Sequence, residues 1–257
     1  MSEFARPTGS ASRARSSRLS PPRIALLLVG FAVLVVLVEA GAFTRVDQFS
    51  LDHLMPTLQT GHTPVGTVAD GLYRPFSPET LPLWQAVDVW TYPCSVLISG
   101  LVMAIVSVVS WRRSRLESGL AILAAWVVGN AVELAGKALI RRPALYGTAH
   151  GLRIHIGGFD NSFPSGHMIR GMLVVAAVAS LWPGARRWLL AWFAPVGPFL
   201  VLSSAHTPSD VLGGLLMGMA LVGGAALLAE SPGLGETSRA IQARFSPQRG
   251  TRRATAP

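Results

Sequence analysis

The sequence predicts an all-α protein, a polytopic membrane bundle of about six transmembrane helices. Half of its 257 residues are hydrophobic, only 14% are charged, and the mean hydropathy is +0.44. A soluble domain has roughly 25% charged residues. Long apolar runs alternate with polar connections, and the arginines gather in every second connection. These three observations favour lipid over water as the main solvent of the chain.

The N-terminal 22 residues are rich in Ser, Arg and Pro, a composition typical of a disordered segment. The apolar run from Ile24 to Phe43 follows, and it is long enough to cross roughly 30 Å of hydrocarbon. A basic start before an apolar run is also typical of a signal peptide, but the apolar part of a signal peptide is shorter. The small residues Ala40–Ala42 also form a poor cleavage site. We therefore expect a disordered tail over 1–22 and then a retained first span.

The rest of the chain divides into one mixed segment, five apolar runs and a second tail. In the mixed segment 44–87, helical spacing of apolar residues predicts a short interfacial helix around Leu51, Leu54, Met55 and Leu58. The further predicted spans are 88–111, 117–140, 165–183, 187–204 and 208–229. The polar and basic segment 231–257 is predicted to be a disordered tail. Residues 23–230 then form one membrane domain.

The arginines predict the orientation of these spans. Fifteen arginines fall in the two tails and in the connections around residues 112–115 and 186–187, whereas five fall in the other connections. Because connections on the cytoplasmic side are enriched in Lys and Arg, both termini are expected in the cytoplasm of a multi-pass cell-membrane protein. This distribution also accounts for the net charge of +9 without nucleic acid, for which the chain has no binding motif.

Cys94 is the single cysteine of the chain, so it has no partner for an intramolecular disulfide or a cysteine-based metal site. His53 and His62 do not form a metal-ligand pattern with other residues. We expect neither a metal nor a cofactor.

Three polar segments lie at the predicted extracytoplasmic ends of the spans. Lys137 to Pro143 end the third span, Ser162 to His167 begin the fourth, and His206 to Asp210 begin the sixth. The spans were assigned from hydropathy, without regard to these segments. Their placement at one membrane face therefore indicates a common site.

The residue types of these segments suit phosphoryl transfer. Cations neutralise phosphate oxygens, and such charge stabilisation is most of what this catalysis requires. Pro164, Ser165 and Gly166 lie where a helix begins, so free backbone N–H groups and a hydroxyl can bind an anion there. Two histidines can supply a nucleophile and a general acid. A nearby carboxylate can fix the tautomer of one of them.

The order Lys, then Pro-Ser-Gly-His, then His-x-x-x-Asp about 40 residues later resembles the signature of the type 2 phosphatidic acid phosphatase superfamily. The resemblance implies a bundle of six membrane helices, no metal and a covalent phosphohistidine. It implies that His206 is the nucleophile, Asp210 its orienting partner and His167 the acid that protonates the leaving group. The residues implied in phosphate binding are Lys137, Ser165 and Gly166.

Two arginines of the family pattern are absent, and their positions hold Ala144 and Leu200. Arg142 lies two residues before the first of these positions. Arg170 lies one turn into the fourth span, on the same helix face as His167. A charge inside a span is a functional candidate. We expect Arg142 and Arg170 to bind phosphate in place of the missing pair. Further candidates are Arg141 and Arg153.

Single residues of the set also fit simpler structural roles. Ser165 could merely cap a helix, and Thr207 to Asp210 form an ordinary helix start. Lys137 could extend to the interface and pair with Glu133, four residues earlier. Taken together, the three segments favour a membrane phosphatase for a lipid phosphate such as phosphatidate or a polyprenyl diphosphate. The alternatives are a lipid phosphotransferase of the same fold and a non-catalytic protein that binds lipid phosphates.

Overall fold

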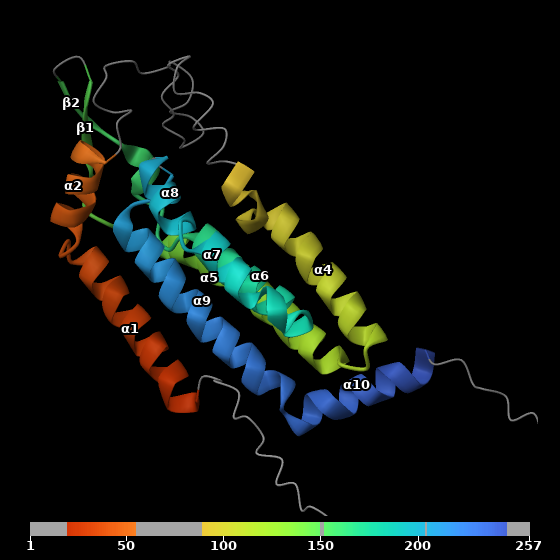
Figure 1. The fold of residues 1–257 in the computed structure, drawn as a ribbon. Coiled ribbons are helices and arrows are strands. Elements are labelled where there is room, and N and C mark those ends of the chain that lie inside the picture. The colour runs from red at the N-terminus through yellow and green to blue at the C-terminus, as the bar shows by residue number, and fades with distance from the viewer. Residues whose placement is uncertain (1–19, 55–88, 150–151, 204, 246–257) are drawn as a thin grey trace, which may run out of the picture.

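The computed structural model describes residues 20–54, 89–149, 152–203 and 205–245, which are mostly helical (Figure 1). The bundle consists of α1 (Pro21–Glu39), α4 (Val96–Arg112), α5 (Leu116–Leu139), α6 (Gly166–Leu181) and α9 (Pro208–Ala229). Each is rich in Ala, Val, Leu and Gly, so its surface is apolar on most sides. Helices of this composition are buried or lie in lipid. The prediction of an all-α membrane bundle is confirmed.

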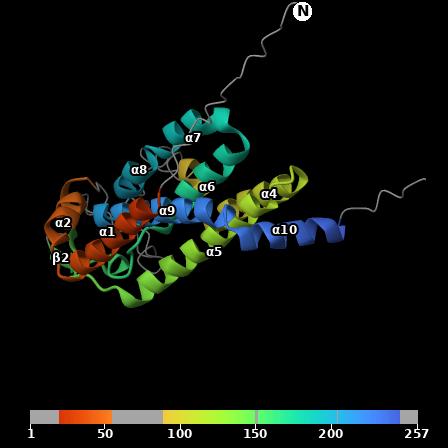
Figure 2. The same ribbon diagram turned by 90° about the horizontal axis from the view of Figure 1, so that it is seen from below.

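Helix α9 lies in the middle of the bundle, packed against α1, α5 and α6, and α4 covers α5 and α6 on the far side (Figures 1 and 2). Small residues allow the close packing of α9. A Cβ at Gly218 would lie within 3.0 Å of Met172 on α6. Small residues at helix contacts are characteristic of membrane bundles. The main core cluster joins α4, α5, α6 and α9.

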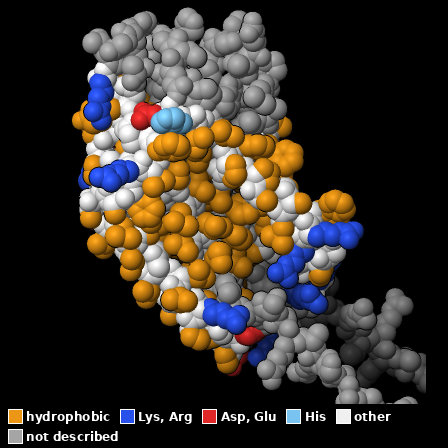
Figure 3. All heavy atoms as spheres, turned by 60° about the vertical axis from the view of Figure 1, so that its left-hand side comes forward, with side chains coloured by type: hydrophobic (Ala, Val, Ile, Leu, Met, Phe, Trp, Pro, Cys, Tyr) orange, Lys and Arg blue, Asp and Glu red, His pale blue; other side chains and the backbone are white. Residues whose placement is uncertain are grey.

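Three described helices have the length and composition to cross a membrane, namely α1, α5 and α9 with 19, 24 and 22 residues. Helices α4 and α6 are also apolar but have 17 and 16 residues. Large hydrophobic side chains are exposed along α1 and α4, where no other described part of the chain covers them. Figure 3 shows a broad hydrophobic band between charged side chains toward the two ends. This surface is suited to lipid.

The predicted span 187–204 is not one continuous helix. It consists of α7 (Arg186–Phe193) and α8 (Val196–Leu202), separated by Ala194 and Pro195. Both intervening residues keep helical dihedral angles. However, Pro195 and Pro198 have no N–H to donate, so the ladder of hydrogen bonds is interrupted. The short helix η3 (Pro183–Ala185) connects α6 to this pair.

One end of the bundle is covered by α2 (Thr44–His53), the hairpin of β1 (Tyr146–Ala149) and β2 (Leu152–His155), and η2 (Gly157–Phe159). In the hairpin, Tyr146 pairs with His155. The predicted interfacial helix is present but begins earlier, at Thr44. Its Leu51 is fully buried in a second apolar cluster with Leu145 and Phe159. Met55 and Leu58 lie outside the described residues. The hairpin was not predicted.

The opposite end is crossed by α10 (Pro232–Phe245), which packs against α5 and α9 (Figure 1). The prediction of a disordered tail from residue 231 is therefore wrong for this segment. Leu234 of α10 packs against the main core, which gives the helix an anchor that its polar composition did not indicate. Near this end, Arg113 donates to the carbonyl oxygen of Leu181 (3.0 Å) and so satisfies the end of α6.

Candidate active site

The loop Phe163–Ser165 begins α6 and lies directly against two other helices. A Cβ at Gly136 of α5 would overlap the Pro164 ring, and a Cβ at Gly214 of α9 would overlap the Ser165 carbonyl oxygen. The loop can approach this closely because both positions are glycine. The Ser165 N–H donates to the Asp210 carbonyl oxygen (3.0 Å). The second and third polar segments of the sequence are thus in direct contact.

Asp210 lies in the first turn of α9 and is completely buried. Thr207 is the N-cap of this helix, with Pro208 at its first position, as the sequence indicated. The Thr207 N–H donates to Asp210 Oδ2 (3.0 Å), which is one half of a capping box. Nδ1 of His206 lies 3.4 Å from the same oxygen. The helix start therefore holds the carboxylate toward His206, and Nε2 of the ring has no hydrogen-bond partner within the described part of the chain.

His206 is placed by the turn that precedes α9. Its backbone N–H donates to the Leu200 carbonyl oxygen at the end of α8 (3.0 Å). His167 lies in the first turn of α6, and the centres of the two imidazole rings are 6.0 Å apart at 64° to each other. The two histidines that the sequence assigned to catalysis therefore face each other.

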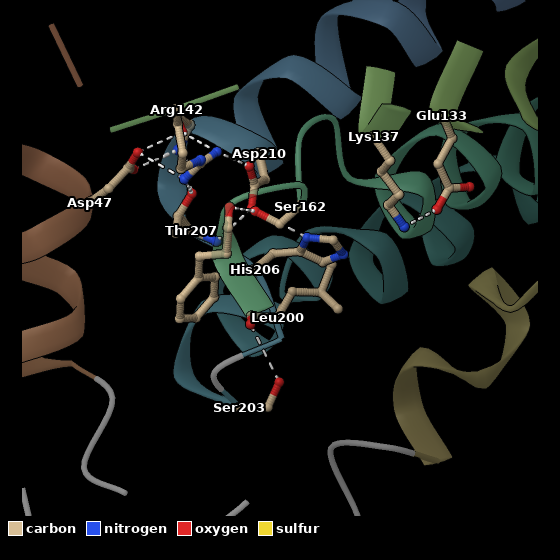
Figure 4. A network of polar contacts seen from close by, with 12 residues as sticks. Asp47, Glu133, Lys137, Arg142, Ser162, Leu200, Ser203, His206, Thr207 and Asp210 are labelled. Carbon is tan, nitrogen blue, oxygen red and sulfur yellow. Dashed lines mark hydrogen bonds and ion pairs between the residues drawn. The ribbon is translucent and has the colours of Figure 1, made fainter. Parts of the chain in front are cut away.

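Arg142 lies behind Asp210 on the side away from His206 (Figure 4). Its Nη2 donates to Asp210 Oδ1 and Ser209 Oγ, and its Nη1 donates to Thr207 Oγ1 (2.7 Å). The side chain is only 3% exposed. These contacts occupy both terminal nitrogens, whereas Nε has no partner among the described residues. They give Arg142 a role in holding Asp210, which differs from the predicted contact with phosphate.

Asp47 of α2 completes this group, and the sequence interpretation did not assign it a role. Its Oδ2 accepts from Arg142 Nη1 (3.2 Å) and from the Ser209 hydroxyl (2.7 Å), and its Oδ1 accepts from the Ser209 N–H (3.1 Å). Burial raises the pKa of Asp47, while the hydrogen bonds of Ser209 and the charge of Arg142 oppose that rise. One signal was available, because Asp47 shares a helix face with the buried Ser50 and Leu51.

Lys137, Glu133 and Arg170 form a second charged group. Lys137 Nζ donates to Glu133 Oε1 (2.7 Å), and Arg170 Nη1 donates to Glu133 Oε2. Arg170 also donates to the Cys94 carbonyl oxygen (2.7 Å) and to Asn130 (3.1 Å). Its side chain is 4% exposed, whereas that of Lys137 is 38% exposed. Arg170 is thus tied to the protein, and the accessible cation of this group is Lys137.

The start of α6 keeps an unused hydroxyl beside this second group. Ser165 is the N-cap of α6 and fully buried, yet its Oγ has no hydrogen-bond partner among the described residues. A buried polar atom without a partner costs free energy, so this hydroxyl is suited to hydrogen-bond a phosphoryl oxygen. The Glu133 carboxylate lies against Gly166, where a Cβ would overlap it. Gly166 therefore allows an anionic group to approach the helix start.

The two positions that lack the arginines of the family pattern are not equivalent. Leu200 is buried in an apolar cluster with Met168, Phe193 and Val196, so this side of the site is hydrophobic. Ala144 is partly exposed in the segment after α5. The further candidates lie on the exposed surface, where Arg141 donates to Asn161. Arg153 lies over the Tyr146 ring at 4.4 Å.

Comparisons with known proteins identify the family of the chain and a similar fold. The sequence profile of the PAP2 superfamily matches residues 88–230, more than half of the chain. The fold is similar to the crystal structure of the first transmembrane PAP2-type phosphatidylglycerolphosphate phosphatase from Bacillus subtilis. The TM-score is 0.52 at 15% identity, over 88% of this chain and 98% of that chain. No curated protein matches the chain significantly.

The matched region contains all three polar segments, both facing histidines and Asp210, whereas α1 and α2 precede it. The family, predicted from the order and spacing of a few polar residues, is confirmed by a match that extends from α4 to α9. The chain belongs to the PAP2 superfamily.

Proposed function

We propose that this protein is an integral membrane phosphatase that hydrolyses lipid phosphates or diphosphates through a phosphohistidine. Family membership supports phosphatase activity. The observation that carries the proposal is the arrangement of His206 between Asp210 and His167, next to a helix start with an unused Ser165 hydroxyl. This arrangement combines a nucleophile, a proton donor and an anion site.

In the proposed reaction, Nε2 of His206 attacks the phosphorus atom while Nδ1–H faces Asp210. A bond forms between nitrogen and phosphorus, and the bond from phosphorus to the leaving oxygen breaks. His167 gives a proton to that oxygen, so the alcohol or phosphate leaves neutralised. His167 then accepts a proton from water, which attacks phosphorus and releases inorganic phosphate and free His206. Lys137, Ser165 and the N–H groups of the first turn of α6 stabilise the phosphoryl oxygens.

The proposed substrate is amphipathic because the site lies at one end of a bundle with a hydrophobic flank (Figure 3). The proposed topology has six spans, with α7 and α8 together as the fifth, both termini in the cytoplasm and the site on the extracytoplasmic side. Arg23, Arg112 and Arg186 support it, since they lie at the end opposite to the site. A lipid phosphate would then enter from the outer leaflet.

The test is phosphate release by the purified protein in detergent, measured with phosphatidate, phosphatidylglycerol phosphate and a polyprenyl diphosphate. We expect turnover of at least one of them and none by His206→Ala at equal expression. A rapid acid or alkaline quench with a labelled substrate should show an acid-labile, alkali-stable phosphoenzyme. Label found on a lipid acceptor would favour a phosphotransferase. A folded protein that binds these lipids and turns over none would be a non-catalytic member of the family.

A further inference from the structure

Asp47 is a buried acid that reaches the catalytic residues from outside the region that matches the PAP2 profile. The match begins at residue 88, whereas Asp47 lies on α2, which follows α1 and covers the end of the bundle. Asp47 is 2% exposed. A buried carboxylate requires compensation by hydrogen bonds or an opposite charge. The partners of the Asp47 carboxylate therefore indicate its role.

Among the described residues, all the hydrogen bonds of the Asp47 carboxylate lead toward the start of α9. It binds Ser209 through the backbone N–H and the hydroxyl, and it binds Arg142 through Nη1. Arg142 in turn binds Asp210, and Asp210 faces His206. One guanidinium is thus shared between two carboxylates (Figure 4). Bidentate and charge-assisted contacts of this kind fix geometry as well as contribute energy.

We propose that Asp47 is a positioning residue of the phosphatase reaction, which orients Arg142 and Ser209 and thereby holds Asp210 toward His206. This inference rests on the proposed function. Asp47 does not touch the substrate in this scheme, because Arg142 and Asp210 lie between it and the histidine.

The charge of Asp47 has a distinct consequence for the attack step. When Nε2 of His206 forms its bond to phosphorus, the ring gains positive charge, which Asp210 stabilises. Arg142 alone would neutralise Asp210. With Asp47 added, the three groups carry a net charge of −1 beside His206, counted from two carboxylates and one guanidinium. In a buried site, such a charge acts over several ångströms with little screening.

The same helix offers a matched control that separates this effect from the docking of α2. Gln48 binds the backbone of β1 by accepting from the Tyr146 N–H (3.0 Å) and donating to its carbonyl oxygen (2.6 Å). Gln48 makes no hydrogen bond to Arg142, Ser209 or Asp210, and its partners among the described residues are Tyr146 and Asp52. Loss of Gln48 should weaken the attachment of α2, while the group around Arg142 keeps its charge.

The experiment compares Asp47→Asn, Asp47→Glu and Gln48→Ala with the wild type on the best lipid phosphate. We expect Asp47→Asn to lower kcat by at least about ten-fold with KM nearly unchanged, because it removes charge and keeps shape. Single-turnover measurements should show that formation of the phosphoenzyme is the slowed step. Asp47→Glu, which keeps the charge, should retain more activity than Asp47→Asn. Gln48→Ala should lower the unfolding temperature and leave kcat within about two-fold of the wild type.

Two results would overturn the inference while the proposed function stands. One is an active wild type with Asp47→Asn at normal kcat. The other is an equal loss of kcat in Gln48→Ala, which would reduce Asp47 to an anchor of α2. If Asp47→Asn fails to fold, Asp47→Glu and Gln48→Ala are compared instead. Asp47→Glu keeps the negative charge and should preserve kcat, so a large loss of kcat in Asp47→Glu would count against the inference. A wild type inactive on every phosphate ester, with no phosphoenzyme, would overturn both proposals together.

Discussion

Arg170 of α6 and Glu133 of α5 form an ion pair inside the bundle, with side chains only 4% and 10% exposed. The family pattern has an arginine at the position of Leu200, and the sequence suggested that Arg170 takes over its contact with phosphate. The structure instead gives Arg170 three partners within the protein, Glu133, Asn130 and the Cys94 carbonyl. Replacement of Arg170 should therefore lower the stability of the fold before it affects phosphate binding.

The pair can be tested by a double-mutant cycle of Arg170→Met and Glu133→Gln, followed by thermal unfolding in detergent. Arg170→Met should destabilise by about 3–5 kcal/mol, because it leaves a buried carboxylate with Lys137 as its remaining cation. The double variant should lose less than the sum of the single losses. If Arg170→Met is as stable as the wild type and loses only affinity for phosphate, Arg170 binds phosphate and is not needed for the stability of the fold.

Gly214→Ala should damage the site from within α9. The added methyl group would overlap the Ser165 carbonyl oxygen, a backbone atom that cannot move without shifting the loop at the start of α6. We expect phosphate release to fall by at least about ten-fold, together with a lower unfolding temperature. Gly224→Ala on the same helix is the control, since nothing lies within 4 Å of its Cβ. It should be neutral or slightly stabilising, because Ala favours a helix over Gly by about 1 kcal/mol.

Ser165→Ala should separate activity from stability. The Ser165 hydroxyl is buried without a partner among the described residues, so its removal costs the empty protein nothing and should raise the unfolding temperature slightly. Phosphate release should fall, with a higher KM, since the hydroxyl is proposed to bind a phosphoryl oxygen. Ser180→Ala at the far end of α6 is the comparison, because that hydroxyl donates to the Ala177 carbonyl oxygen (2.7 Å). The opposite pattern, a less stable Ser165→Ala with normal KM, would mean that Ser165 acts only in the fold.

The orientation in the membrane can be measured with a cysteine at Gly157, an exposed residue of η2 beside the site. In a Cys94→Ala background, Gly157→Cys should react with a membrane-impermeant thiol reagent in intact cells. The wild type should remain unlabelled, because Cys94 is completely buried. Labelling of Gly157→Cys only after lysis would place the site in the cytoplasm and reverse the proposed topology.

The sequence predicted the bundle and the three polar segments well, since hydropathy and motif order are local signals. His206, Asp210 and His167 lie together as the motifs implied. The helix start at Thr207 also agrees, because capping depends on neighbouring residues. The break near Pro195 could have been predicted from proline chemistry. Local signals were sufficient wherever the partners are close in the chain.

The partners of the two buried arginines could not be predicted in the same way. Arg142 meets Asp47 across 95 residues, and Arg170 meets Glu133 across 37. Lys137 and Glu133, by contrast, are four residues apart on one helix, and their pairing was anticipated. The sequence assigns Arg142 to phosphate because it lies near a missing family arginine, and Arg170 because a charge inside a span requires a partner. Tertiary packing supplied one in each case.

The ion pair between α5 and α6 also bears on how the chain enters the membrane. Helix α6 contains Arg170 but no acidic residue, whereas Glu133 and Lys137 of α5 already neutralise each other one turn apart. An isolated α6 would therefore carry an unpaired charge into lipid, which costs about 2.5–3.5 kcal/mol at a helix centre and less at the position of Arg170, one turn from the helix start. Because α5 is synthesised first, its carboxylate is present when α6 emerges. The order of the helices along the chain thus makes the Glu133 carboxylate available before Arg170, the charge that it neutralises, enters the membrane.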